Sequence, residues 1–281
     1  MIARRRAALA SAVLLLAFHA AAAADEIPPP RSRVHVVWDD LRYAGTTAWA
    51  DARVIVTAPL HVRAISEITP RQLLTGGLLL AALGGTIALD ETIRSAGRDM
   101  DRHTASTLQT TASTISLSSL GALYIAGLAQ DDDRWRHESL TGIEGVAVSS
   151  GVVKLTKMAF RRERPDSGAG STAFFRNGDS FVSDAATPPY AAAEAVSAAF
   201  DHSWWAMLPA YAMATAVGVG RIGQDRHWAS DIVGSAYVGA GTTALFDFLH
   251  RREEADASPS VEITPQAAMD HSMGIGLTLR F

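Results

Sequence analysis

The sequence predicts an all-α fold: a bundle of about six core helices, with a peripheral N-terminal extension and a short C-terminal β-hairpin. Long, mostly alanine-rich apolar segments follow one another after residue 69, and strand-like alternation is nearly absent from them. Hydrophobic residues make up 48% of the 281-residue chain, which is ample material for a core. We expect four regions in order: a signal peptide (1–24), an N-terminal extension (25–68), the helical core (69–252), and a linker with the hairpin (253–281).

The first 24 residues resemble a secretory signal peptide. Three arginines, at positions 4 to 6, precede an apolar run from Ala7 to Ala20, and small residues follow as far as Ala24. An uncleaved amphipathic anchor is the alternative interpretation. We therefore expect an exported protein of the periplasm or cell envelope, with peripheral or integral membrane contact.

Charge and cysteine content exclude several classes of protein. The formal net charge is −4, and it falls to −7 when the three arginines of the leader are removed. Such an acidic balance argues against nucleic acid as a partner. The chain has no cysteine, so disulfides, thiolate catalysis and zinc–cysteine sites are excluded.

The predicted core helices are apolar around most of their circumference. The first begins at Thr69–Pro70 and has 17 uncharged residues between Leu73 and Leu89. Residues 104–130 carry no charge, and further apolar segments follow at 141–160, 187–200, 204–220 and 228–250. A membrane span needs about 20 mostly apolar residues. Because glycine, serine and threonine dilute these segments, the sequence favours a soluble or peripheral bundle over an integral one.

The C-terminal residues have a different hydrophobic pattern from the predicted helices. A charged break at 251–260 precedes "MGIGLTLRF", in which every second residue from Met273 to Phe281 is apolar. This alternation predicts a β-hairpin packed on the surface of the bundle.

A histidine and an aspartate interrupt one apolar segment, in the stretch "GRIGQDRHWASD". His227 and Asp231 are one helical turn apart, so Asp231 can accept a hydrogen bond from one ring nitrogen of His227. The other nitrogen would then be free to act as a nucleophile or general base. A solvated surface pair is the alternative.

A group of cations lies in "KLTKMAFRRERPD". Lys157 and Arg164 are two helical turns apart and share a face, and Pro165 ends the helix there. Together with Arg221 they could surround a tetrahedral oxyanion, because the forked guanidinium group suits phosphate. A solvated helix terminus is the alternative for "RRER" taken alone.

Together, the two stretches resemble the first and third signatures of the type-2 phosphatidic acid phosphatase and vanadium haloperoxidase superfamily. Here the signatures read Lys157, Arg164-Pro165 and Arg221, His227, Asp231, with Gly220 where serine is usual. The resemblance covers roughly residues 70–250. It implies that the three cations hold phosphate oxygens, that His227 forms a phosphohistidine, and that Asp231 orients it, without a metal or other cofactor.

The second signature of that superfamily, Pro-Ser-Gly-His, is degenerate in this chain. "SFVSDAA" keeps Ser183, a candidate phosphate-binding residue, but has Val182 for proline, Asp184 for glycine and Ala185 for histidine. In the family this histidine protonates the leaving oxygen, and its loss typically costs about 10²–10⁴ in rate. Haloperoxidase chemistry uses it as well and is therefore disfavoured.

Three interpretations follow from this departure. In the first, the chain is a phosphatase in which Asp184, or a histidine such as His202, is the substitute acid. In the second, it is a phosphatase restricted to good leaving groups such as diphosphates. In the third, it is a pseudoenzyme that binds a phosphate or phospholipid head group. A structural envelope protein with a chance motif match is a fourth. The expected substrates are lipid phosphates, diphosphates or small phosphomonoesters.

Overall fold

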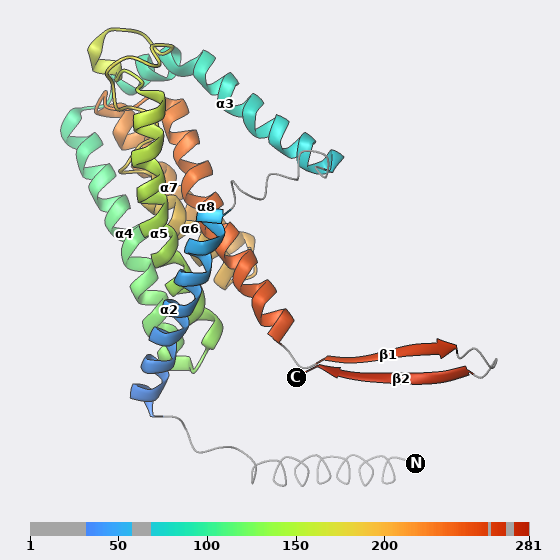
Figure 1. The fold of residues 1–281 in the computed structure, drawn as a ribbon. Coiled ribbons are helices and arrows are strands. Elements are labelled where there is room, and N and C mark those ends of the chain that lie inside the picture. Colours follow the sequence, from blue (N-terminus) through green and yellow to red (C-terminus); the bar gives the residue numbers. More distant parts are fainter. Residues whose placement is uncertain (1–31, 58–68, 258–259, 268–272, 281) are drawn as a thin grey trace, which may run out of the picture. The chain divides into compact units, whose positions relative to one another are not determined.

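The computed structural model describes residues 32–57, 69–257, 260–267 and 273–280, and α-helices dominate them (Figure 1). Seven helices lie in this part of the chain: α2 Arg33–Thr57, α3 Pro70–Gly97, α4 Arg102–Gln130, α5 Asp133–Phe160, α6 Thr187–Ala199, α7 Trp204–Gly223 and α8 Ala229–Ala257. A 3-10 turn, η2, spans Pro165–Ser167. The predicted signal peptide lies outside the described residues.

The chain divides into two compact units, 1–42 and 43–281, and the division falls within α2. Of the first unit, the structure describes the opening residues of α2. The other helices belong to the second unit. The predicted N-terminal extension thus contains a helix of 25 residues where the sequence suggested short apolar pieces.

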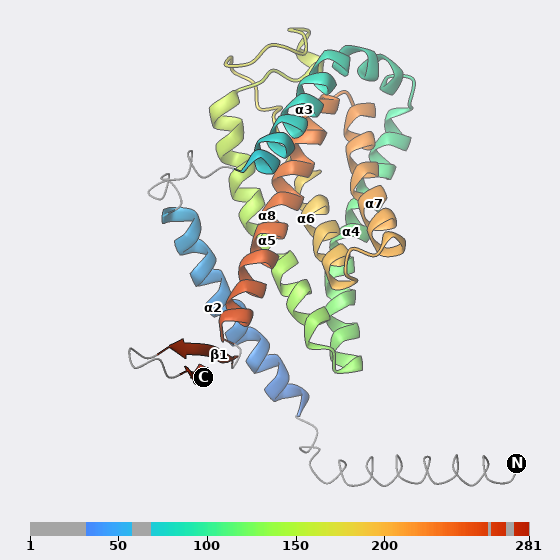
Figure 2. The same cartoon turned by 90° about the vertical axis from the view of Figure 1, so that its right-hand side faces the viewer.

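Helix α6 is the centre of the bundle, and it packs against α4, α5, α7 and α8 (Figure 2). Nearly all of its residues are buried. Its alanines let the neighbouring helices approach closely: a Cβ at Gly142 of α5 would come within 2.6 Å of the Cβ of Ala195. Because α6 is short and begins directly after the second-signature loop, its packing fixes that loop on the bundle.

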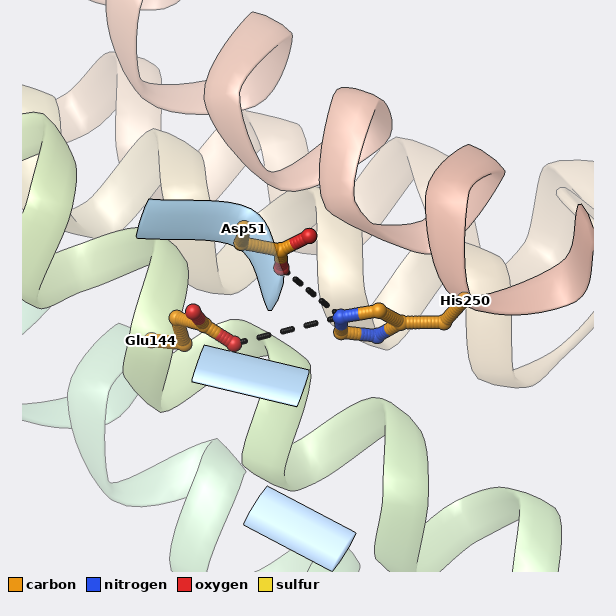
Figure 3. Close-up of side chains that lie close together, drawn as sticks. All are labelled: Asp51, Glu144 and His250. Carbon is orange, nitrogen blue, oxygen red and sulfur yellow. Dashed lines mark hydrogen bonds and ion pairs between the residues drawn. The ribbon is translucent and has the colours of Figure 1, made fainter. Parts of the chain in front are cut away.

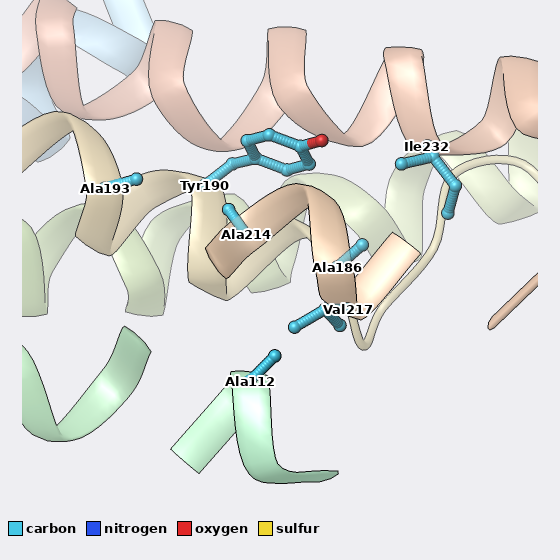
Figure 4. Packing of buried hydrophobic residues seen from close by; sticks show 7 residues of the cluster. All are labelled: Ala112, Ala186, Tyr190, Ala193, Ala214, Val217 and Ile232. Carbon is cyan, nitrogen blue, oxygen red and sulfur yellow. The ribbon is translucent and has the colours of Figure 1, made fainter. Parts of the chain in front are cut away.

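One hydrophobic cluster joins the start of α6 to its neighbours (Figure 4). Its buried members come from α4, α6, α7 and α8 and from the residue before α6: Ala112, Ala186, Tyr190, Ala193, Ala214, Val217 and Ile232. The hydroxyl of Tyr190 lies 3.1 Å from that of Thr215 in α7, so the one polar atom of this ring has a partner.

The ends of several helices meet at one end of the bundle, at the top of Figure 1. Helix α5 ends there at the left-handed residue Arg161, and the loop to α6 follows. The link from α7 to α8 is tied to α3, because Arg94 donates two hydrogen bonds to Asp225 (2.7 and 2.9 Å). All three superfamily signatures fall at this end.

The predicted fold class was wrong in one respect, the C-terminal β-hairpin. Segments β1 (Ser260–Ala267) and β2 (Met273–Arg280) run antiparallel, with Val261 opposite Leu279, but this sheet has two strands and gains no third. A two-stranded ribbon is marginally stable in water because it buries little apolar surface. The hairpin is therefore not an established element of the fold, and the fold class is all-α.

Three helices of the described residues, α3, α4 and α8, are long and apolar enough to cross a membrane. None of the apolar window of α3 is buried in the protein. Its large exposed side chains are Leu73, Leu74, Leu78, Leu79, Leu80 and Leu89. The sequence-based preference for a soluble bundle is not supported, because an apolar surface of this kind favours membrane association.

We predict that the native chain stays in carbonate-washed membranes and that Leu80→Arg reduces the retained share. Leu80 is 71% exposed near the middle of α3, and an arginine at the centre of a span costs roughly 2.5–3.5 kcal/mol on insertion scales. Leu80→Ala is the control and should stay in the membrane. Release of the native chain by carbonate would contradict the prediction.

Candidate active site

Two of the predicted phosphate-binding cations, Lys157 and Arg164, lie near the C-terminal end of α5. Lys157 lies in the last turn of α5, but this helix ends at Phe160, so the prediction that one helix carries both cations was wrong. Arg164 lies in the extended backbone before η2, because Arg161 takes a left-handed conformation that ends the helix. Lys157 donates a hydrogen bond to the backbone carbonyl of Asp179. Arg164 donates two to the Asp179 carboxylate, at 2.6 and 2.9 Å. This aspartate was not predicted from the sequence.

The third cation, Arg221, lies in the last turn of α7. It donates to the side-chain oxygen of Gln224 at 3.3 Å. The preceding Gly220, a departure from the usual serine, has a physical reason: a Cβ there would lie 2.7 Å from the carbonyl oxygen of Ala105 in α4. We call Lys157, Arg164 and Arg221 the cation cage.

His227 lies two residues before α8 and Asp231 lies in the first turn of that helix, and they are 1% and 0% exposed. The Nδ1 atom of His227 is 2.9 Å from the Ser180 carbonyl oxygen and 3.4 Å from Asp231 Oδ2. Both neighbours accept hydrogen bonds, so the proton belongs on Nδ1 and the lone pair on Nε2. Burial lowers the pKa of His227 although Asp231 opposes the shift. The ring is therefore neutral and its Nε2 nucleophilic.

Arg162, which the sequence analysis did not select, holds Asp231 in place. This fully buried side chain donates to Asp231 Oδ1 at 2.5 Å and to Ser230 Oγ at 2.7 Å. Its guanidinium carbon is 4.6 Å from the ring centre of Phe174 and 5.5 Å from that of Trp228. In "RRER" nothing in the sequence distinguishes this arginine from its solvated neighbours.

Asp90 of α3 is the second residue that the sequence analysis missed. It is fully buried, and its Oδ2 accepts hydrogen bonds from Arg162 and from Ser230 Oγ, both at 2.6 Å. Its Oδ1 accepts from the Ser230 backbone at 2.9 Å. A signal was present, because Asp90 ends an uncharged run of 17 residues, where a lone carboxylate needs a partner.

The second-signature loop packs directly against the backbone of Arg162. Ser180 N donates to the Arg162 carbonyl at 2.9 Å, and Ser180 Oγ donates to Asp231 Oδ2. Only glycine fits at position 178, because a Cβ there would lie 2.0 Å from the same carbonyl oxygen. The loop thus keeps its place although its signature has degenerated.

Within that loop, Ser183 is buried and Asp184 lies near His227. Ser183 N donates to Ser235 Oγ at 2.9 Å, which ties the loop to α8. Asp184 Oδ1 is 3.8 Å from His227 Nε2, and the Asp184 side chain is 63% exposed. Three buried polar atoms of this site have no hydrogen-bond partner among the described residues: Ser183 Oγ, Arg221 Nε and His227 Nε2.

The electrostatic surroundings of Asp184 include all three cations of the cation cage. Burial would raise the pKa of its carboxyl, but nearby positive charges hold it below its usual value. The cations that lower it are Lys157, Arg221 and Arg164. One carboxylate therefore lies within electrostatic reach of every member of the cation cage and of the nucleophile. An anion bound there would experience the same field.

His202, the other candidate substitute acid, lies elsewhere. It follows α6, whereas the second-signature loop precedes that helix. Its Nε2 lies 3.1 Å from the Glu194 carboxylate. The structure does not bring His202 to the cage.

A possible metal-ligand set lies within the second unit, apart from the cage (Figure 3). His250 Nε2 is 2.8 Å from Asp51 Oδ2 and 4.0 Å from Glu144 Oε2, and its Nδ1 is 3.1 Å from Thr141 Oγ1. His250 and Asp231 are separated by 19 residues of one helix, about 28 Å. Hydrogen bonds at both ring nitrogens account for this cluster as a link between helices.

Comparisons with known proteins find a family and a solved structure similar to this chain. Residues 140–253 match the family model of the PAP2 superfamily, which confirms the predicted resemblance over α5 to α8. A similar solved structure is that of the first transmembrane PAP2 type phosphatidylglycerolphosphate phosphatase from Bacillus subtilis, at 20% identity and a TM-score of 0.45, covering 64% of this chain and 94% of that one. No curated protein matches the chain.

We predict that Asp90→Asn lowers the free energy of unfolding by roughly 3–5 kcal/mol, because it leaves the buried Arg162 with one carboxylate fewer. Denaturation in detergent would measure the change. Asp201→Asn removes the same charge from an ion pair in which Asp201 is 74% exposed, and it should cost about 0–1 kcal/mol. Equal effects of the two variants would show that the Arg162 network does not stabilise the fold.

Proposed function

We propose that this chain is a metal-independent phosphohydrolase of the cell envelope that acts through a phosphohistidine at His227. The carrying observation is that Lys157, Arg164 and Arg221 all lie within electrostatic reach of Asp184, whose Oδ1 is 3.8 Å from His227 Nε2, an atom without a partner among the described residues. The PAP2 superfamily match over 140–253 supports the same chemistry.

Phosphoryl transfer needs mainly positioning and charge stabilisation, and the site supplies both. Lys157, Arg164 and Arg221 would hold the non-bridging oxygens, and Ser183 Oγ would donate a further hydrogen bond. His227 Nε2 would attack phosphorus in line. The Ser180 carbonyl and Asp231 hold the opposite ring nitrogen, so the ring cannot turn away during attack.

The leaving oxygen poses the main difficulty, because Ala185 cannot donate a proton. Asp184 remains the candidate substitute acid on position, 3.8 Å from His227 Nε2. Its lowered pKa leaves it ionised at neutral pH, so it has no proton of its own to give. Substrates with good leaving groups, such as aryl phosphates and diphosphates, should therefore react best.

The apolar helices support lipid phosphates and lipid diphosphates as the first substrates to test. Helices α3, α4 and α8 can span a bilayer, and the exposed leucines of α3 would face acyl chains. A surface cavity of about 410 Å³ borders Lys157, Gly178 and Asp179 and would admit a head group to the cage. Small phosphomonoesters fit the same chemistry.

A second function, phosphate or head-group binding without turnover, has its own support. Ala185 removes the general acid, and the Asp179 carboxylate already occupies the guanidinium fork of Arg164. A cage that keeps its cations and loses its acid would still bind an anion.

We predict that the purified chain releases phosphate from an aryl phosphate without added metal and that His227→Ala abolishes this release, because no other group can attack phosphorus there. Colorimetric detection of phosphate in the presence of a chelator measures both chains. His202→Ala is the control and should retain activity. Activity that survives His227→Ala would exclude the phosphohistidine, whereas an inactive native chain that still binds phosphate would favour the binding function.

Restoring the second signature should increase turnover of poor leaving groups. The triple variant Val182→Pro, Asp184→Gly, Ala185→His returns the general acid, which is worth about 10²–10⁴ in rate. We expect that gain on an alkyl phosphate and a much smaller one on an aryl phosphate. Equal gains on both substrates would mean that leaving-group protonation does not limit the native chain.

A further inference from the structure

Two carboxylates lie among the cations of the cation cage. Asp179 occupies the fork of Arg164, and Asp184 Oδ1 lies 3.8 Å from His227 Nε2. Three cations and two carboxylates leave the cage with a net charge of +1 when His227 is neutral. The pKa of Asp179 is lowered to about 2, mainly by its hydrogen bonds from Arg164, so this carboxylate stays ionised at any pH near neutrality.

The layer behind the nucleophile does not add positive charge. Asp231 and Asp90 both bind the single guanidinium of Arg162, so these three groups together contribute no net positive charge. A phosphate dianion at the cage would thus carry one more charge than the +1 that the cage can neutralise. It would also lie beside Asp184, and like charges at such a distance repel.

We infer that the site takes the phosphoryl group as its monoanion, with the remaining P–OH donating a hydrogen bond to Asp184. This inference rests on the proposed function and specifies the ionisation state of its substrate. A protonated phosphate carries one negative charge, which matches the cage. Its hydroxyl turns Asp184 from a repelling neighbour into a hydrogen-bond acceptor. The proton that Ala185 cannot supply then enters with the substrate.

The chemical step balances with this proton. His227 Nε2 forms a bond to phosphorus, and the bond between phosphorus and the leaving oxygen breaks with its electron pair on that oxygen. The P–OH proton passes through Asp184 to the same oxygen, so the alcohol leaves neutral and Asp184 is ionised again. Water then attacks phosphorus, the N–P bond breaks with its electrons on Nε2, and a water proton passes through Asp184 to the released phosphate.

The pH dependence of activity should then follow the ionisation of the substrate phosphate. The charged or titratable groups facing Asp184 come from α5, the loops, α7 and the start of α8: Lys157, Arg164, Asp179, Arg221 and His227, with Asp231 and Arg162 behind. His227 is kept neutral by burial. The second pKa of a phosphomonoester is about 6. Activity should therefore fall as the pH rises above that value.

The test is the binding of inorganic phosphate and of sulfate to the purified chain, measured by calorimetry between pH 6 and pH 8.5. Phosphate loses its monoanion about tenfold for each pH unit above its second pKa. We expect the native affinity for phosphate to fall in parallel and sulfate, a dianion throughout, to bind weakly. In Asp184→Asn the phosphate slope should flatten and sulfate affinity should rise. Asp201→Asn, which removes a distant exposed charge, should behave as the native chain.

The outcomes separate this inference from the proposed function. Native affinity that is equal at both ends of the pH range, or an unchanged slope in Asp184→Asn, overturns the monoanion even if the chain hydrolyses aryl phosphates through His227. The predicted slope in a chain without turnover would support monoanion binding and reject the catalytic step. Absence of phosphate binding by both the native chain and Asp184→Asn would overturn both proposals.

Discussion

The buried guanidinium of Arg162 is the interaction on which the rest of this site depends. It binds Asp231 through one nitrogen and Asp90 through another, so it joins the loop after α5 to α8 and α3. A buried cation is costly unless it is fully paired, and here two carboxylates, Ser230 Oγ and the Ser171 carbonyl accept its hydrogen bonds. Because Arg162 fixes Asp231, and Asp231 Oδ2 lies beside His227 Nδ1, the His227 ring is held in place as well.

Close backbone approaches follow from that arrangement. The second-signature loop can donate from Ser180 to the Arg162 carbonyl only if residue 178 has no side chain. Likewise, α7 can present Arg221 beside α4 only with glycine at 220. A side chain at either position would clash with a neighbouring backbone carbonyl, so both positions require glycine.

Local sequence patterns predicted the core helices and the residues of the cation cage. They could not predict Arg162 and Asp90, whose pairing joins distant parts of the chain. The order and spacing of Lys157, Arg164, His227 and Asp231 along the chain selected them from the sequence. Arg164 and His227 nevertheless lie outside the helices that the sequence predicted for them, because α5 ends before the first and α8 begins after the second. Arg162 and Asp90 are separated by 72 residues, and no local pattern joins them. The hairpin was predicted from alternation alone, but alternation does not supply the further strand or helix surface that a β-ribbon needs. Dilution by small residues likewise concealed how apolar α3, α4 and α8 are.

The substitutions in the second signature remove one proton-transfer group and add another. Replacing histidine by alanine removes a proton donor, and replacing glycine by aspartate at position 184 adds a proton acceptor 3.8 Å from the nucleophile. Under the proposed function, this position accepts a proton where the superfamily signature has a proton donor. Such a site suits a substrate that brings its own proton, since a general acid and a protonated phosphate can both neutralise the leaving oxygen. The two substitutions are then complementary: each alone would leave either a missing proton or an unmatched negative charge.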